Sequence, residues 1–528
     1  MLKSSLPCKN TLVVPFVLLL ASCSGGAESG GSSNGGTNGG GAASGGQAGS
    51  ATGDGGHLGN GGKEQSAGGA SSASGGIAGG GDGGGNGAAG ATGSGGTTGS
   101  GGENAAGGGG NAGDGGSPGS DGGASDGSPP PASGAETPLP DCKRKVPVLN
   151  AAALANALGA AMPGDCLELA DGDYAAPTIT AKGTEAAPIV VRAQSRLKVN
   201  MTGVVKMNDV SWIVLEGMTF PGAGGTSIGG ASDHIRITRS RYNSGSFHVE
   251  GTAHDNRVDH SEFGPKKDLG NLIQPTGLST NTTVDHNYLH DVSAAGGNGE
   301  ETIRLGCCGA TFDNHPTGNI VEYNLLVGCS GDAEIISMKS SSNTFRYNTI
   351  RNSAGNISLR AGKNNLVYGN FVFGSGNQGG IRAYDAGHKI YNNYIATGSA
   401  LIANRVDDIH AAVVNAVIVH NTFLGSVNLA GTGNTFSNNI TSATPTLGSA
   451  MAMGNMLAAD VGLQMKGELR VIAAGSKAID AAVGSFPFVT DDMSGQPRMK
   501  PDVGADELSD APETRRPLTA ADVGPDAP

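Results

Sequence analysis

A short phrase recurs through the second half of the chain and limits what the chain can fold into. It reads LEGMTF, ITRSRY, VDHSEF, VDHNYL, VEYNLL, FRYNTI, VYGNFV, IYNNYI and IVHNTF. Its fourth residue returns every 21 to 28 residues, except for one step of 37 between Asn287 and Asn324. Short β-rich phrases at such a period indicate a solenoid in which each period is one coil of strands. Asparagines repeated in register indicate a stacked hydrogen-bond ladder. We therefore predict an all-β fold, a parallel β-helix.

Two further segments complete this predicted solenoid. The long step of 37 coincides with GCCGATFDNHPTG, which we interpret as a loop that projects from its coil. Before the first coil, NAAALANALGAAMPGD has Asn150 as a helix N-cap and Pro163-Gly164 as a stop. We expect this helix to cap the N-terminal end of the solenoid, where open strand edges would otherwise invite aggregation.

The N-terminal quarter of the chain is different in kind. Residues 1–22 have two lysines and a short apolar run, as in a secretory signal peptide, and LASC resembles a bacterial lipobox. Cys23 would then be lipidated, with an ordinary signal peptide and an incidental cysteine as the alternative. Residues 23–140, rich in Gly, Ser and Ala, are predicted to be a disordered tether, and 141–528 the β-helix domain. We expect a secreted lipoprotein, anchored at the bacterial outer membrane or cell surface.

Charge and cysteines restrict the partners and the compartment. Residues 141–528 contain 37 acidic residues and 30 Lys plus Arg, which argues against nucleic acid as a partner. An anionic partner must therefore meet a local basic groove. In an oxidising compartment, Cys142–Cys166 is a plausible disulfide, as is Cys329 with Cys307 or Cys308. Nothing in the sequence indicates a protein partner.

Charged residues recur at one phase of the predicted coils. Asn298, Glu334, Arg360 and Arg382 follow their coil markers by 11, 10, 12 and 12 residues. Equal offsets place residues of successive coils in one column, with about 4.8 Å between strands. One face should therefore present an amide, a carboxylate and two guanidinium groups. Lys339 lies 21 residues before Arg360, hence about one coil away.

This column has the chemistry of a uronate lyase. Asp332 and Glu334 are two residues apart, so they point the same way on a strand, and with Asn298 they form an all-oxygen set suited to calcium. A calcium-bound uronate carboxylate would make the neighbouring C5 proton removable. Lys339 would take that proton, since nearby positive charge favours the neutral amine. Arg360 would stabilise or protonate the departing oxygen.

These motifs resemble polysaccharide lyase family 6, the chondroitinase B and alginate lyase family. The resemblance runs from about residue 146 to the end, through PGDCLELADGDY, VDHSEFGPKK, NGEETIRLG, GDAEIISMKSSSNTFRYNT, GNISLRAGKNN, GGIRAYDAGHKIYNNY and PDVGADE. It implies a right-handed parallel β-helix and a calcium-dependent lyase. Two departures are Asp332, where glutamate is common, and Ala361 after Arg360, where histidine is frequent.

The resemblance also implies roles for individual residues. It assigns catalysis to Lys339 and Arg360, and calcium to Asn298, Asp332 and Glu334. It further implies that substrate acidic groups contact Arg304, Arg382, Lys266 and His260, while His388 is a candidate groove residue. Structural roles stay open for several of these: Arg382 and Arg304 could brace coils by pairing with acids, His388 could be a turn residue hydrogen-bonded to backbone, and one of His260 and His286 could be structural.

We therefore predict a lipid-anchored, calcium-dependent polysaccharide lyase that cleaves an anionic uronate polysaccharide by β-elimination. Alginate is the first expected polymer, because that activity is the more widespread in the family, and dermatan sulfate (chondroitin B) is the second. One alternative is a non-catalytic β-helix that binds polysaccharide. Another is a uronan C5-epimerase, although the DPH motif of alginate epimerases is absent. A pectate lyase is a third.

Overall fold

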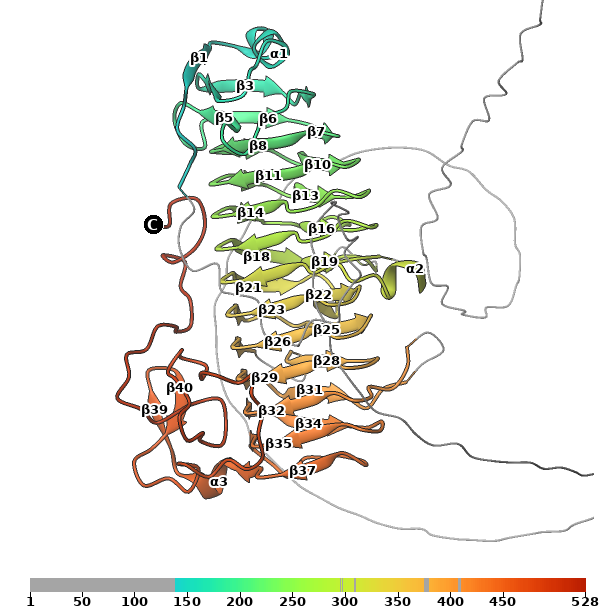
Figure 1. Cartoon of the computed structure of the whole chain (residues 1–528), viewed down its shortest axis with the longest axis vertical. Helices are drawn as coiled ribbons and strands as arrows, with labels where there is room; N and C mark the ends of the chain where they lie inside the picture. Colours follow the sequence, from blue (N-terminus) through green and yellow to red (C-terminus); the bar gives the residue numbers. More distant parts are fainter. Residues whose placement is uncertain (1–137, 295, 297, 308–309, 375–378, 407–409) are drawn as a thin grey trace, which may run out of the picture. The chain divides into compact units, whose positions relative to one another are not determined.

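A computed structural model describes residues 138–528, except residues 295, 297, 308–309, 375–378 and 407–409. The predicted signal peptide, Cys23, almost all of the tether and Cys308 lie outside the described residues. Three long parallel sheets, here called sheets A, B and C, form a β-solenoid (Figure 1). Among the described residues, no helix is long and apolar enough to cross a membrane. The predicted parallel β-helix is confirmed.

Sheet A has 14 strands, and each strand pairs in parallel with the equivalent strand of the next coil. Val258, Val284 and Phe345 are fully buried in the core, so the residues that follow them point outward. The strands in order are β1 (Arg144–Val148), β2 (Asp165–Leu169), β5 (Ile189–Ala193), β8 (Ser211–Glu216), β11 (Asp233–Thr238), β14 (Arg257–Asp259), β17 (Thr283–Asp285), β20 (Ile320–Glu322), β23 (Thr344–Arg346), β26 (Leu366–Tyr368), β29 (Lys389–Tyr391), β32 (Val417–Val419), β35 (Thr435–Ser437) and β37 (Met451–Met453).

Sheet B has 13 strands. Where the recurring phrase contains an asparagine, the strand begins at the next residue. Its buried residues, among them Phe220, Tyr242 and Phe263, stack on one another with ring centroids about 4.5 Å apart. The strands are β3 (Gly172–Ala175), β6 (Val199–Thr202), β9 (Met218–Phe220), β12 (Arg241–Tyr242), β15 (Glu262–Phe263), β18 (Tyr288–Ser293), β21 (Leu325–Ser330), β24 (Thr349–Arg351), β27 (Phe371–Phe373), β30 (Tyr394–Ala396), β33 (Thr422–Phe423), β36 (Ile440–Thr441) and β38 (Met456–Leu457).

Sheet C has 11 strands and carries the predicted column of charged residues. Ile303, Ile336 and Ile357 are paired across three neighbouring strands and fill the core. The strands are β4 (Thr178–Ile179), β7 (Val204–Asn208), β10 (Gly225–Gly229), β13 (Ser246–Val249), β16 (Ile273–Pro275), β19 (Ile303–Leu305), β22 (Glu334–Lys339), β25 (Asn356–Ala361), β28 (Ile381–Ala383), β31 (Ser399–Ala403) and β34 (Ser426–Leu429).

The repeated asparagines form the predicted ladder at the turn from sheet A to sheet B. Asn324, Asn348 and Asn370 are fully buried, and each donates from its side chain to the amide oxygen of the next asparagine at 2.9–3.1 Å. Each also hydrogen-bonds backbone carbonyls of its own turn and of the previous coil. The ladder therefore satisfies backbone groups that a tight turn would leave unpaired.

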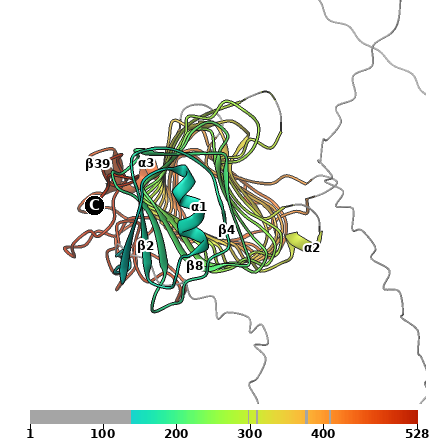
Figure 2. The same cartoon turned by 90° about the horizontal axis from the view of Figure 1, so that it is seen from above.

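A helix forms where the sequence predicts it. Helix α1 (Ala151–Gly159) starts after Asn150, whose side chain accepts a hydrogen bond from Ala153 N at 3.0 Å. Leu154 and Leu158 are buried in the same core as the first coils. Viewed along the solenoid, α1 lies over the interior at this end (Figure 2). Helix α2 (Ala310–Asp313) belongs to the long loop and projects from the coil (Figure 1).

The cysteines match the predictions only in part. Cys142 and Cys166 form the predicted disulfide. Cys329 is a buried free thiol, so its predicted disulfide is wrong. The Cys329 side chain points into the core beneath β21, where its sulfur faces the Leu289 carbonyl oxygen at 3.6 Å. Cys307 is disulfide-bonded.

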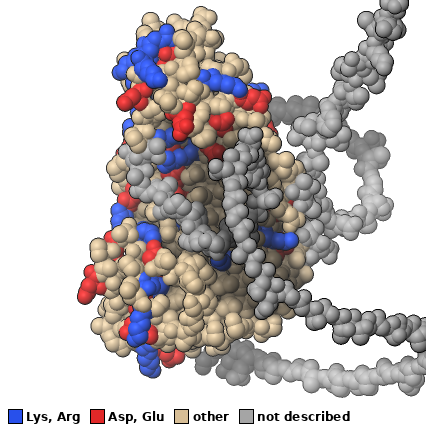
Figure 3. Space-filling model, viewed as in Figure 1, with Lys and Arg blue, Asp and Glu red and all other residues tan. Residues whose placement is uncertain are grey.

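The C-terminal segment packs against the outside of the solenoid. After α3 (Ala458–Val461), the hairpin β39 (Leu463–Lys466) and β40 (Leu469–Ile472) packs on Phe371 and Tyr394 of sheet B. The last residues reach the N-terminal coils, where Arg239 donates to the carbonyl oxygens of Pro525 and Ala527. Lysine, arginine and acidic side chains are interspersed over the face seen in Figure 3. Any strong positive potential must therefore be local.

Candidate active site

The predicted charged column lies on the outer face of sheet C. Glu334, Arg360 and Arg382 belong to β22, β25 and β28, which are consecutive strands of the sheet. Lys339 ends β22 and pairs with Ala361, next to Arg360, across an irregularity in the register. The expected spacing of one coil between Lys339 and Arg360 is therefore confirmed.

A row of polar residues runs across these strands at one register position. Arg304 of β19 pairs with Ser337, Ser337 with Ser358, and Ser358 with Arg382. Because their inward neighbours are core residues, all four side chains point outward. Arg382 donates from Nε to the Ser358 hydroxyl at 3.1 Å. The row places two guanidinium groups on the same face as Lys339.

Glu334 is the anionic centre of this face. Its side chain is 7% exposed, and its carboxylate accepts hydrogen bonds from Arg382 and from the Ser337 hydroxyl. Arg360 Nε lies 3.3 Å from Glu334 Oε1. Both arginines also lie over the ring of buried Tyr384, at 5.6 and 6.0 Å from its centroid. Glu334 thus orients two guanidinium groups toward the outer face, and Tyr384 supports them from below.

Lys339 has an acidic partner that the sequence reasoning did not identify. Its ammonium donates to Glu301 Oε1 at 2.7 Å, while Asn271 donates to Glu301 Oε2 at 2.9 Å. Burial would raise the pKa of the Glu301 carboxyl, but the charge and hydrogen bonds of Lys339 and Asn271 outweigh it and lower the pKa. The sequence reasoning expected only cations around Lys339, whereas the structure adds the anionic side chain of Glu301. Glu301 lies in the motif NGEETIRLG, and its position three residues after Asn298 was the available signal.

The predicted calcium ligands lie together only in part. Asp332 Oδ2 accepts hydrogen bonds from the backbone N–H groups of Gly299 and Glu300, at 3.2 and 3.4 Å, which brings the exposed Asn298 near Asp332. Oxygen donors of these types suit calcium. Both Glu334 oxygens, however, already accept hydrogen bonds from Arg382 and Ser337. Among the described residues, no group of three or more His, Cys, Asp and Glu side chains could hold a metal ion. The donor chemistry fits calcium, whereas the contacts of Glu334 do not.

Two predicted substrate residues lie away from Lys339. His260 is at the turn from sheet A to sheet B, 2% exposed, with Nδ1 3.0 Å from Asp259 and its ring stacked on His286 at 4.9 Å. Lys266 lies in the connection from β15 to β16, where it donates to Asp268 and to a backbone carbonyl and is 4% exposed. No contact in the described part of the chain joins either residue to Lys339.

His388 is part of the structure's interior. It is fully buried, its Nε2 lies 2.6 Å from the Tyr384 carbonyl oxygen, and its Nδ1 accepts from Asn365 N at 3.2 Å. Asn365 continues a second amide ladder that includes Asn343 and Asn319 at the turn from sheet C to sheet A. Burial lowers the pKa of His388 to about 4. His388 thus occupies a position in this ladder. This contact pattern matches the structural role that was the alternative to a role in the substrate groove.

Comparison with known proteins follows this geometry. The family described as Chondroitinase B matches residues 232–493, which include every strand of the candidate site. The chain belongs to polysaccharide lyase family 6. It is therefore a polysaccharide lyase. None of the curated proteins matches the sequence at a significant level.

Solved structures agree with this lyase in fold. The PL6 family alginate lyase AlyGC is 23% identical with a TM-score of 0.53, and the match covers 70% of this chain and 59% of that chain. A PL6 family polysaccharide lyase from Pseudopedobacter saltans is 21% identical with a TM-score of 0.52, covering 72% and 99%. A PL6 alginate lyase in complex with a trisaccharide is 20% identical with a TM-score of 0.53, covering 70% and 97%.

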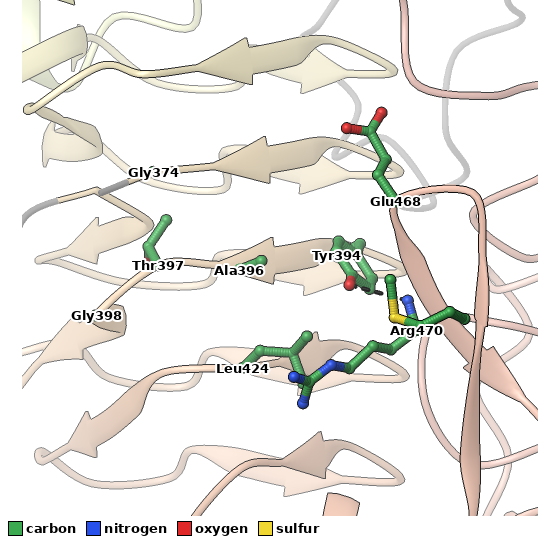
Figure 4. Close-up of a pocket in the computed structure, with 9 residues that line it drawn as sticks. Gly374, Tyr394, Ala396, Thr397, Gly398, Leu424, Glu468 and Arg470 are labelled. Atoms are coloured by element: carbon green, nitrogen blue, oxygen red, sulfur yellow. Dashed lines mark hydrogen bonds between the residues drawn. The ribbon is translucent and has the colours of Figure 1, made fainter. Parts of the chain in front are cut away.

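A separate cavity of about 450 Å³ lies where the β39–β40 hairpin meets sheet B. Figure 4 shows the Tyr394 hydroxyl next to Arg470, and the Arg470 side chain extending past Leu424. Glu468 at its rim is paired with Arg351 at 2.6 Å. These residues belong to sheet B and the hairpin, so this cavity is distinct from the candidate site on sheet C.

Proposed function

We propose that this lyase cleaves a uronate-containing polysaccharide by β-elimination, with alginate as the first substrate and dermatan sulfate as the second. The observation that carries the proposal is the pairing of β22 with β25, which puts Lys339 and Arg360 side by side on the outer face of sheet C. Two solved proteins of this fold are described as alginate lyases. The family's own name, Chondroitinase B, supports the second polymer.

The reaction uses groups that the face presents. The neutral amine of Lys339 takes the C5 proton of the uronate. The electron pair of the broken C5–H bond then forms the C4–C5 double bond as the C4–O bond breaks. Arg360 lies beside the departing oxygen and stabilises its negative charge. The departing oxygen is then protonated to a hydroxyl group by solvent or by the lysine ammonium. Arg304 and Arg382 neutralise the uronate carboxylate, which stabilises charge developing on C5.

Glu301 positions Lys339 for this step. The 2.7 Å hydrogen bond holds the lysine amine at one place on the outer face, and the buried carboxylate is itself held by Asn271. The pair joins two neighbouring coils, because Glu301 precedes β19 and Lys339 ends β22.

Calcium dependence is a separate proposal. The ion would be held by Asn298, Asp332 and Glu334 and, when bound, would neutralise the uronate carboxylate. Binding requires that Arg382 release Glu334, because an ion and a guanidinium compete for the same oxygen. Export as a lipoprotein through Cys23, with residues 23–140 as a tether, is likewise proposed from the sequence alone.

The test is an ultraviolet assay of the unsaturated product on alginate, its mannuronate-rich and guluronate-rich blocks, and dermatan sulfate. We expect elimination on at least one polymer and its loss in Lys339→Ala. Binding without elimination on every polymer would favour a non-catalytic polysaccharide-binding protein. Exchange of the C5 proton without chain cleavage would favour a C5-epimerase.

A further inference from the structure

The polar row of sheet C does not end at the proposed catalytic residues. The register continues from Arg304 through Gln274 of β16, His248 of β13 and Ser227 of β10 to Lys206 of β7. Inward neighbours such as Met207 and Phe247 are fully buried, so the row residues point outward. We call Lys206, Ser227, His248, Gln274 and Arg304 the upstream row.

The upstream row lacks the acidic partners found elsewhere on the solenoid. On sheet A, Arg236, Arg257 and Arg346 each pair at 2.6 Å with an acid on a neighbouring strand. Within the described ranges, the exposed Lys206 has no ion pair. The Nε2 atom of His248 is buried without a hydrogen-bond partner, and so is the Nε atom of Arg304. Both side chains are partly exposed, so the row can meet an external ligand through its exposed atoms.

The spacing of the row matches an extended polysaccharide. Neighbouring strands are about 4.8 Å apart, close to the advance of one sugar unit in an extended chain. Lys206, His248 and Arg304 lie on every second strand, β7, β13 and β19, with Ser227 and Gln274 between them. In a ribbon-like polymer, alternate sugars face the same way, so carboxylates that face the protein also recur at every second unit.

We propose that the upstream row is a binding track that holds uronate units beyond the cleaved bond, with the polymer lying along the solenoid axis toward the N-terminal coils. This inference rests on the proposed function for the identity of the ligand. From β7 to β22 the track spans five strand spacings, about 24 Å. The lyase therefore holds a segment of about five sugar units on this side of Lys339.

The row residues contribute differently to the track. Lys206 and Arg304 supply positive charge to carboxylates. Burial lowers the pKa of His248, and nearby Arg304 lowers it further, whereas Glu250 opposes both. His248 is therefore largely neutral at neutral pH, and its imidazole hydrogen-bonds sugar hydroxyl or carboxylate oxygens. Ser227 and Gln274 supply hydrogen bonds between these positions.

The test compares uronate oligosaccharides of four and ten units, from the polymer that the enzyme prefers. For each variant we would measure the ratio of kcat/KM on the decamer to kcat/KM on the tetramer. Lys206→Ala with His248→Ala should lower this ratio about three- to tenfold, since each exposed contact contributes modestly. Added salt should lower the wild-type ratio and have less effect on the double variant. Lys198→Ala is the matched control, because Lys198 is exposed and lies between β5 and β6, away from sheet C.

The outcomes separate the track from the proposed function. A ratio equal to wild type in the double variant would overturn the track, even in a confirmed lyase. If no uronate polymer is cleaved, decamer and tetramer binding are compared by calorimetry. Tighter decamer binding that depends on Lys206 and His248 would then support the track while the proposed reaction fails. Equal binding of both lengths would overturn the track.

Discussion

The Lys339 ammonium donates a hydrogen bond of 2.7 Å to Glu301, a carboxylate that is only 2% exposed. A lysine that acts as a base therefore has a permanent anionic neighbour. The pair joins β22 to the segment before β19, so the amine is held in place by two coils of the solenoid. This relationship makes Glu301 a positioning residue for the proposed base.

Replacing Glu301 should lower kcat. In Glu301→Gln the side chain keeps its size but loses the charge that pairs with the Lys339 ammonium. We expect kcat to fall and KM to change little, because the amine is held less firmly at its place on the outer face. Initial rates of product formation over a range of polymer concentrations would show this. An unchanged kcat, in a variant with wild-type thermal stability, would exclude the positioning role.

The two proposed catalytic residues should differ in severity. Lys339→Ala removes the base, and we expect kcat to fall about 10²- to 10⁴-fold. Arg360→Lys keeps a cation near Glu334 and should retain more activity than Arg360→Ala, because electrostatic stabilisation is its main role. Initial rates of unsaturated product formation measure both effects. Wild-type activity in Lys339→Ala would remove it from the mechanism.

Arg382 and calcium should compete for Glu334. In Arg382→Ala the carboxylate loses its closest cation, so calcium affinity should rise if the ion binds Glu334, while KM for the polymer rises as well. Calorimetric titration with calcium alone measures the first effect, and a chelator added to the wild-type assay measures calcium dependence. Affinity that falls in Arg382→Ala would place the ion elsewhere.

The asparagine ladder should contribute strongly to stability. Asn370 is fully buried and donates to two backbone carbonyls and to Asn393, so Asn370→Ala leaves several buried groups unpaired. We expect a loss of about 3 kcal/mol in the free energy of unfolding. Asn200→Ala, at a partly exposed site, should cost less than about 1 kcal/mol. Chemical denaturation of residues 141–528 would compare them, and equal costs would argue against the ladder.

Buried acids in the C-terminal segment should make stability depend on pH. Burial raises the pKa of Asp506 to about 6 and that of Glu507 to about 7. Both groups are therefore protonated in the folded state at a pH where they ionise in the unfolded chain. Their contribution to stability is present near pH 4 and is lost as the pH rises through 6 and 7. The melting temperature should thus fall between pH 5 and 8, and Glu507→Gln should reduce this fall. A slope unchanged in Glu507→Gln would contradict the assignment.

The site could be predicted from the sequence as far as the repeat reaches. Equal offsets from the repeated asparagines place Glu334, Arg360 and Arg382 on consecutive strands, because every coil adds one strand to each sheet. The same arithmetic places Lys339 beside Arg360. It cannot assign His388 or His260, because a histidine at a turn can face inward into a ladder or outward, and the sequence is the same in both cases.

The sequence by itself determined the solenoid, the asparagine ladder and the shared face of Lys339, Arg360 and Arg382. Each of these depends on periodic or local patterns. Only the tertiary structure decided that Glu301 pairs with Lys339 and that Arg382 donates a hydrogen bond to the Glu334 carboxylate. Those contacts join segments 38 and 48 residues apart, and the side-chain directions that create them depend on the packing of particular coils.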